Sequence, residues 1–218
     1  MKNCSCFLSS SIGKKIVVAV TGLLMLGFVV GHMLGNLQVF LGPEKINDYA
    51  EFLHETKGLL WGTRVVLLFS VVLHFIFTVQ LTRLNKNSRP EKYENHTMVQ
   101  ANAPSRFMIW SGLFLAFYVV FHLLHLTVGS VHPAFISGDV YNNIVVGFSS
   151  KLVSFVYLLA MISLGMHLYH GVYSVFQTLG LNHPKINFFR QYLALFIAIA
   201  IPLGYSAIPL AVLMGILK

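Results

Sequence analysis

The sequence contains few charged residues and very few acidic ones. Charged side chains make up 10% of the 218 residues, against about 25% in a typical soluble domain. Hydrophobic residues make up 56%, and seven Asp and Glu stand against fifteen Lys and Arg, which gives a net charge of +8. This composition excludes an ordinary soluble domain and predicts a membrane protein. In such a protein an excess of basic residues marks the cytoplasmic side, so we expect no binding to nucleic acid.

Cysteine is scarce as well. The two cysteines, Cys4 and Cys6, lie close together near the first residue. An iron–sulfur cluster usually takes four cysteine ligands, and the spacing of this pair matches no common zinc motif. The sequence therefore excludes an iron–sulfur cluster or a zinc site built from the thiols of this chain, and we expect two reduced thiols without a role.

Five long apolar runs follow one another along the chain. Each reaches the roughly 20 residues that a helix needs to cross a bilayer. They cover residues 16–41, 59–84, 107–128, 152–179 and 192–217. The first run is too long for a cleaved signal peptide, and Pro202 and Pro209 predict a kink in the last one. We therefore expect an all-α membrane protein in which residues 1–218 form a single transmembrane domain and the first four helices form a bundle.

The distribution of basic residues predicts the topology. Lys14 and Lys15 precede the first span, and the connections after the second and fourth spans are basic too. The basic residues of these two connections are Arg83, Lys86, Arg89, Lys92, Arg106, Lys185 and Arg190. The connections after the first and third spans contain most of the acidic residues. The positive-inside rule therefore predicts a cytoplasmic N-terminus and a C-terminus on the outer side.

Histidine is the main titratable residue inside the spans. Six of the ten histidines lie there, and no Asp or Glu does. These six are His32, His74, His122, His125, His167 and His170. A proton relay, a zinc site or a di-iron site in a membrane would normally include carboxylates or thiolates. Neutral imidazoles on four helices instead suit haem iron, which accepts one histidine on each face.

The depth of each histidine predicts how they pair. His32 follows Lys15 by 17 positions and His122 follows Arg106 by 16, which puts both about 25 Å from the cytoplasmic charges. His74 and His167 lie 17 and 16 positions after Lys57 and Lys151 on the outer side, and so nearer the cytoplasm. We expect an outer haem between the first pair and an inner haem between the second. Counted from the cytoplasmic charges, His170 fits the inner level about as well as His167.

Four segments resemble a known family. They read GHMLGN, VVLHFIFTVQ, SGLFLAFYVVFHLLHLTVG and GMHLYHGVYSVFQTLGL. They are similar to the diheme cytochrome b558 membrane-anchor subunit of succinate:quinone oxidoreductases, the succinate dehydrogenase and fumarate reductase cytochrome b family. The resemblance implies two haem b groups with His32, His74, His122 and His167 as axial ligands. It also implies that the outer pair binds the haem distal to the soluble subunits.

The resemblance implies a function in electron transport. The expected partners are a flavoprotein subunit and an iron–sulfur subunit on the cytoplasmic face of a bacterial inner membrane. Electrons would pass between them and a membrane quinone, menaquinone or ubiquinone, while succinate itself reacts in the partners.

Relatives place the third-helix ligand ten residues after a Ser-Gly or Thr-Gly pair, and Gly112 to His122 has this spacing. One departure concerns proton movement, because no glutamate stands in the fourth span before His167.

Further residues are candidates for binding the haem propionates or the quinone. Arg64 lies inside the second span, where an unpaired cation is costly, and is the best propionate candidate. His125 and His170 are candidates for contacts with a propionate, a quinone or a backbone carbonyl. Near the outer haem, the quinone candidates are Gln38, His54 and Glu55, together with Asn36. Thr21, Arg106 and His183 are weaker candidates toward the cytoplasm.

Two other interpretations remain open at this point. The chain could be the cytochrome b subunit of another membrane oxidoreductase, such as a formate dehydrogenase, a hydrogenase or a b561-type enzyme. It could also be a haem-free transporter whose histidines bind substrate or pack. An absorption spectrum separates the transporter from both cytochromes, and the identity of the partner subunits separates the two cytochromes from each other.

Overall fold

A computed structural model describes residues 6–88, 107–181 and 183–218. Every regular element in these ranges is a helix. In chain order they are α1 (Cys6–Ser9), α2 (Ser11–Asn36), the 3-10 helix η1 (Leu37–Leu41), α3 (Pro43–Glu55), α4 (Lys57–Asn87), α6 (Met108–Leu126), α7 (Val140–Ser149), α8 (Lys151–Thr178) and α9 (Pro184–Leu213). The predicted all-α class is confirmed. Arg89, Lys92 and Arg106, which entered the topology prediction, lie outside the described residues.

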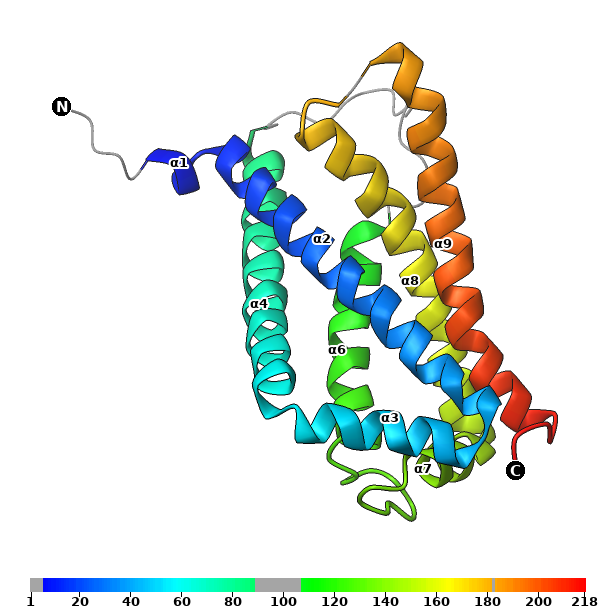
Figure 1. Ribbon diagram of the computed structural model, residues 1–218. Coiled ribbons are helices and arrows are strands. Elements are labelled where there is room, and N and C mark those ends of the chain that lie inside the picture. Colours follow the sequence, from blue (N-terminus) through cyan, green and yellow to red (C-terminus); the bar gives the residue numbers. More distant parts are fainter. Residues whose placement is uncertain (1–5, 89–106, 182) are drawn as a thin grey trace.

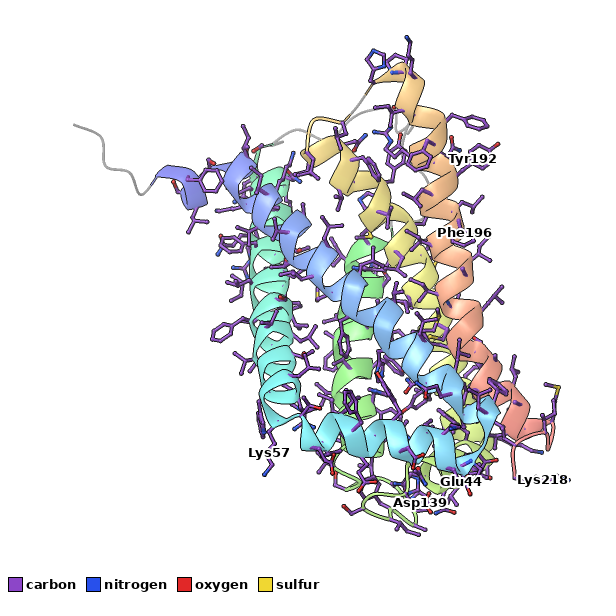
Figure 2. The ribbon with its side chains drawn as sticks, in the orientation of Figure 1. Glu44, Lys57, Asp139, Tyr192, Phe196 and Lys218 are labelled. Carbon is purple, nitrogen blue, oxygen red and sulfur yellow. The ribbon has the colours of Figure 1, made fainter. Side chains whose placement is uncertain are left out.

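Five of these helices are long and apolar enough to cross a membrane. They are α2 with η1, α4, α6, α8 and α9, as predicted. Their outward surfaces expose large apolar side chains such as Leu68, Trp110 and Phe196, which only a lipid environment makes favourable. Figure 2 shows Glu44, Asp139 and Lys218 gathered at one end of the molecule, opposite the N-terminus. The chain is therefore a multi-pass membrane protein.

Local signals explain where the helices begin and end. The Ser10 side chain accepts a hydrogen bond of 3.0 Å from the Gly13 N–H and so caps α2. Gly42 adopts a φ of 103° after η1, and α3 starts at the following proline. The last helix begins at Pro184, earlier than residue 192 where its apolar run starts, because the His183 side chain caps it and proline suits the first helical turn.

The last helix continues without interruption through Pro202 and Pro209. Proline lacks an N–H, so the carbonyl of Ala198 receives no helical hydrogen bond from Pro202. Gly165 of α8 lies directly against that carbonyl, since a Cβ at this glycine would be 2.8 Å from the Ala198 oxygen and 3.3 Å from Pro202 Cγ. Helix α8 therefore packs closely over the part of α9 where a helical hydrogen bond is missing, and a glycine makes that close approach possible.

The four predicted bundle helices form two pairs. In Figure 1, α2 and α4 lie beside each other, and α6 lies beside α8, which in turn packs along α9. In the parts of the chain that the structure describes, α2 also contacts α8, whereas α4 packs closely along neither α6 nor α8. The two pairs are thus held together on one side only.

Two short helices at the outer end were not expected from the sequence. Helix α3 crosses the end of the bundle and lies near α7 (Figure 1). Asn47 of α3 donates a hydrogen bond of 3.1 Å to Asp139 and accepts one of 3.0 Å from the Tyr141 N–H. Tyr49 packs against Gly35 of α2, where a Cβ would come within 2.7 Å of its ring. Together α3 and α7 form a cap over the outer end.

Candidate functional site

The structure brings the four histidines together as two pairs. The ring centres of His32 on α2 and His122 on α6 are 6.0 Å apart. Those of His74 on α4 and His167 on α8 are 6.4 Å apart. Each pair joins one helix of the α2/α4 pair to one helix of the α6/α8 pair.

These distances fit one metal ion between two imidazoles. A nitrogen–metal bond is about 2 Å long and a ring centre lies about 1 Å behind its nitrogen, so two axial imidazoles have centres about 6 Å apart. A structural zinc site would need about four ligands, but the described residues contain no group of three or more His, Cys, Asp and Glu able to hold a metal. Two histidines per site fit haem iron.

The two pairs lie at different depths. Gly22 of α2 contacts the His74 ring and Gly112 of α6 contacts the His167 ring, each with a Cβ position 3.4 Å from the ring carbon Cε1. Gly22 stands ten residues before His32, and Gly112 stands ten residues before His122. Ten residues correspond to about 15 Å along the helix axis. The levels of the two pairs are therefore about 15 Å apart, with the His74 pair nearer the N-terminal end.

The inner rings are oriented by hydrogen bonds at Nδ1. His74 Nδ1 lies 3.1 Å from both the Val18 carbonyl oxygen and Thr21 Oγ1. His167 Nδ1 lies 3.4 Å from Ser111 Oγ. A histidine that binds a metal through one nitrogen normally donates its other N–H to such an acceptor, which fixes the tautomer and the ring orientation. These partners leave Nε2 as the nitrogen that faces the metal position.

The outer rings differ from each other. His122 Nδ1 lies 3.3 Å from the hydroxyl of Tyr157, which leaves its Nε2 as the nitrogen that could bind a metal. His32 stacks on Phe28, and its Nε2 lies 3.2 Å from the side-chain amide nitrogen of Asn36. Metal binding through this Nε2 requires the Asn36 amide to move away.

The remaining intramembrane candidates belong to neither facing pair. His125 is fully buried, and its ring stacks on His132 with centres 5.0 Å apart. The structure thus places His122 opposite His32, whereas His125 faces His132 and shares the Tyr157 hydroxyl with His122. His170 is partly buried. Arg64 is exposed and lies over the Trp61 ring, 5.1 Å from its centre.

The quinone candidates are spread over several elements. Gln38 is half-buried in η1, while His54 and Glu55 are exposed at the end of α3. His183 caps α9, and Arg106 lies outside the described residues.

A small cavity opens between α6 and α8 beside the inner pair, with an almost wholly apolar wall. It is lined by Phe107, Trp110, Ser111, Phe114, Leu159, Ser163 and Met166. This wall offers few donors to a quinone carbonyl.

The sequence contains a signal for some of the hydrogen-bond partners. TGLLMLGFVVGH at residues 21–32 repeats as SGLFLAFYVVFH at residues 111–122. In both, a hydroxyl residue and a glycine precede a histidine by the same spacing. The hydroxyl and glycine contact the inner pair, and the histidine belongs to the outer pair. The full repeat would have identified Thr21 and Ser111 as partners, whereas Tyr157 carries no such signal.

A family model described as succinate dehydrogenase/fumarate reductase transmembrane subunit matches residues 89–204. This range is more than half of the chain and includes α6, α7 and α8 with most of α9. It contains His122 and His167 but not His32 or His74. No curated protein and no solved structure matches the chain significantly.

Proposed function

Because the chain belongs to the succinate dehydrogenase/fumarate reductase transmembrane subunit family, we propose that it is a diheme anchor which passes electrons between an iron–sulfur subunit and a membrane quinone. The observation that carries this proposal is the pair of ring–ring distances, 6.0 Å and 6.4 Å, at two depths of one bundle. His32 and His122 would hold the outer haem b, and His74 and His167 the inner one. When bound, haem supplies reversible one-electron exchange at its iron.

The residues of this chain fix where that exchange takes place. Acceptors at Nδ1 of His74, His122 and His167 hold three of the four rings with Nε2 toward the interior. Apolar helices and the α3/α7 cap exclude bulk water from the outer pair, and exclusion of water is one of the means by which a protein sets a redox potential. The two levels are separated along the axes of the membrane-spanning helices, an arrangement that would suit electron movement across the bilayer.

The partners are proposed to dock at the N-terminal end. Lys14, Lys15 and Lys185 lie at this end, which the positive-inside rule assigns to the cytoplasm of a bacterial inner membrane. A flavoprotein subunit and an iron–sulfur subunit there would carry out the succinate or fumarate chemistry. The quinone, menaquinone or ubiquinone, is proposed to bind near Gln38, His54 and Glu55 at the outer end.

Purification of a tagged chain from its native host tests this proposal. We expect a subunit with covalently bound flavin and an iron–sulfur subunit to co-purify, and succinate to reduce the haem absorption bands. The His167→Ala variant should keep both partners but lose succinate-driven reduction of the outer haem. Haem bands with other partner subunits would identify a different membrane oxidoreductase. A protein that contains no haem after expression with adequate haem would contradict the proposal.

A further inference from the structure

Tyr157 lies between two histidines at the outer end of α8. Its hydroxyl oxygen is 3.3 Å from Nδ1 of His122 and 3.0 Å from Nδ1 of His125. The side chain is 5% exposed. Edge-to-face contacts with Phe148 and Tyr118, at 4.7 Å and 5.2 Å between ring centres, hold it in place. A single buried hydroxyl thus connects a proposed haem ligand to a second buried histidine.

The donors and acceptors give this connection one direction. A phenol has one proton to donate and can also accept hydrogen bonds. If His122 binds iron through Nε2, its proton is on Nδ1 and is donated to the Tyr157 oxygen. The Tyr157 proton is then free to be donated to Nδ1 of His125. His125 must carry its own proton on Nε2.

Burial of the second histidine, His125, leaves one of its ring nitrogens without a partner among the described residues. His125 is 0% exposed, and its Nε2 has no hydrogen-bond partner among the described residues. The His125 ring packs directly against Gly147, because a Cβ at residue 147 would lie 3.0 Å from His125 Nε2. An apolar side chain would fill the same space without burying an unpaired polar atom. Packing alone therefore does not account for a histidine at this position.

The neighbouring His132 does not compete for the Tyr157 proton. Its Nδ1 accepts a hydrogen bond of 3.1 Å from the Ala134 N–H, so its proton is on Nε2. That nitrogen donates to the Asn143 carbonyl oxygen at 2.9 Å. His132 is thereby a neutral ring with both nitrogens occupied, and it supports His125 by stacking on it.

We propose that Tyr157 and His125 are positioning residues for the outer haem and that their relay behind His122 lowers the midpoint potential of that haem. The inference rests on the proposed function. Hydrogen bonding at the rear nitrogen of a metal-bound histidine fixes its tautomer and increases its basicity. A more basic axial ligand favours ferric over ferrous iron.

Redox titration of the haems in the purified complex tests the inference. The Tyr157→Phe variant removes only the hydroxyl, so we expect two retained haems and an upward shift of the outer potential alone. Each tenfold loss of preference for ferric iron corresponds to about 59 mV. The His125→Leu variant should shift the same haem upward by less, because Tyr157 still accepts from His122. The outer haem is assigned as the one that the His122→Ala variant loses.

Tyr118→Phe is the matched control. It removes a hydroxyl from the same aromatic cluster, and within the described residues that hydroxyl makes no hydrogen bond to a histidine. We expect both potentials to be unchanged.

Two haems with unchanged potentials in Tyr157→Phe would overturn the inference and leave the proposed function intact. An equal shift of the outer potential in Tyr118→Phe would do the same. If Tyr157→Phe loses the outer haem, His125→Leu decides: an upward shift supports the inference, and no shift overturns it. A wild-type chain without haem would instead overturn the proposed function.

Discussion

The inner histidines have unequal hydrogen bonds, and this inequality predicts unequal effects of mutation. His74 Nδ1 has two acceptors at 3.1 Å, the Val18 carbonyl and the Thr21 hydroxyl. His167 Nδ1 has one, Ser111 Oγ, at 3.4 Å. Removal of the Thr21 hydroxyl by Thr21→Val leaves a backbone acceptor in place. Removal of the Ser111 hydroxyl by Ser111→Ala leaves a buried N–H with none.

The size of the difference follows from the cost of an unpaired buried donor. That cost is about 1–3 kcal/mol, and about 1.4 kcal/mol corresponds to a tenfold change in affinity. Because a hydrogen bond of 3.4 Å is long, we expect the lower part of this range for Ser111→Ala, with inner-haem affinity reduced about five- to tenfold. For Thr21→Val we expect a reduction of less than about threefold, since one of two acceptors remains.

Haem transfer from the solubilised protein to excess apomyoglobin measures both effects. The inner haem is assigned as the one absent from the His167→Ala variant. Ser163→Ala is the matched control, because it makes the same substitution in a buried serine of the same cavity wall whose hydroxyl has no histidine partner among the described residues. We expect it to retain both haems like the wild type. Equal losses in Thr21→Val and Ser111→Ala would refute the reasoning from acceptors.

Three further predictions concern the outer site and the helix packing. The His122→Ala variant should bind one haem and His125→Ala two, by pyridine haemochrome assay; the reverse would exchange their roles. The Asn36→Leu variant removes the side-chain amide that lies against His32 Nε2 and would have to move before haem binds. Haem affinity should therefore rise by up to about fivefold. Weaker binding in a haem titration would contradict this. Gly165→Ala should lower the melting temperature by overpacking against α9, whereas Gly171→Ala, with open space around it, should not.

The sequence was sufficient to predict the five spans. Apolar length predicts a membrane helix directly, because each span must cover the same thickness of bilayer. The charges at the span ends then define depth, which pairs His32 with His122 but leaves His167 and His170 both open as the partner of His74. Depth also favours His122 over His125, and the spacing found in the resembling family supports that choice. The structure then places His122 opposite His32, 6.0 Å between ring centres.

Other features could not be read from the sequence. The cap helices α3 and α7 are short and amphipathic, so apolar length gives no signal for them. Tyr157 meets His122 only because of the rotation of α8 against α6, which depends on packing rather than on local pattern. Arg64, the candidate for a haem propionate, is exposed and lies over the Trp61 ring, a contact that the sequence does not predict. A residue's position along a helix predicts its depth but not the direction in which its side chain points.

The packing of the bundle also has a consequence for stability. Helices α2 and α4 form one packed pair and α6 and α8 another, while α4 lacks close packing against α6 and α8 within the described ranges. A cofactor that ligates both pairs would replace the missing contacts. Binding to the folded state alone stabilises that state, so the chain is expected to be more stable with its haems than without them.

The number of haem b groups per chain tests the central claim most directly. It is measured on the purified wild-type protein by pyridine haemochrome absorbance against protein determined by amino-acid analysis. Two facing histidine pairs at two depths predict two haems per chain, one of which is lost when either member of a pair is replaced by alanine. A wild-type value of zero, or of one haem that survives replacement of each histidine in turn, would contradict the account.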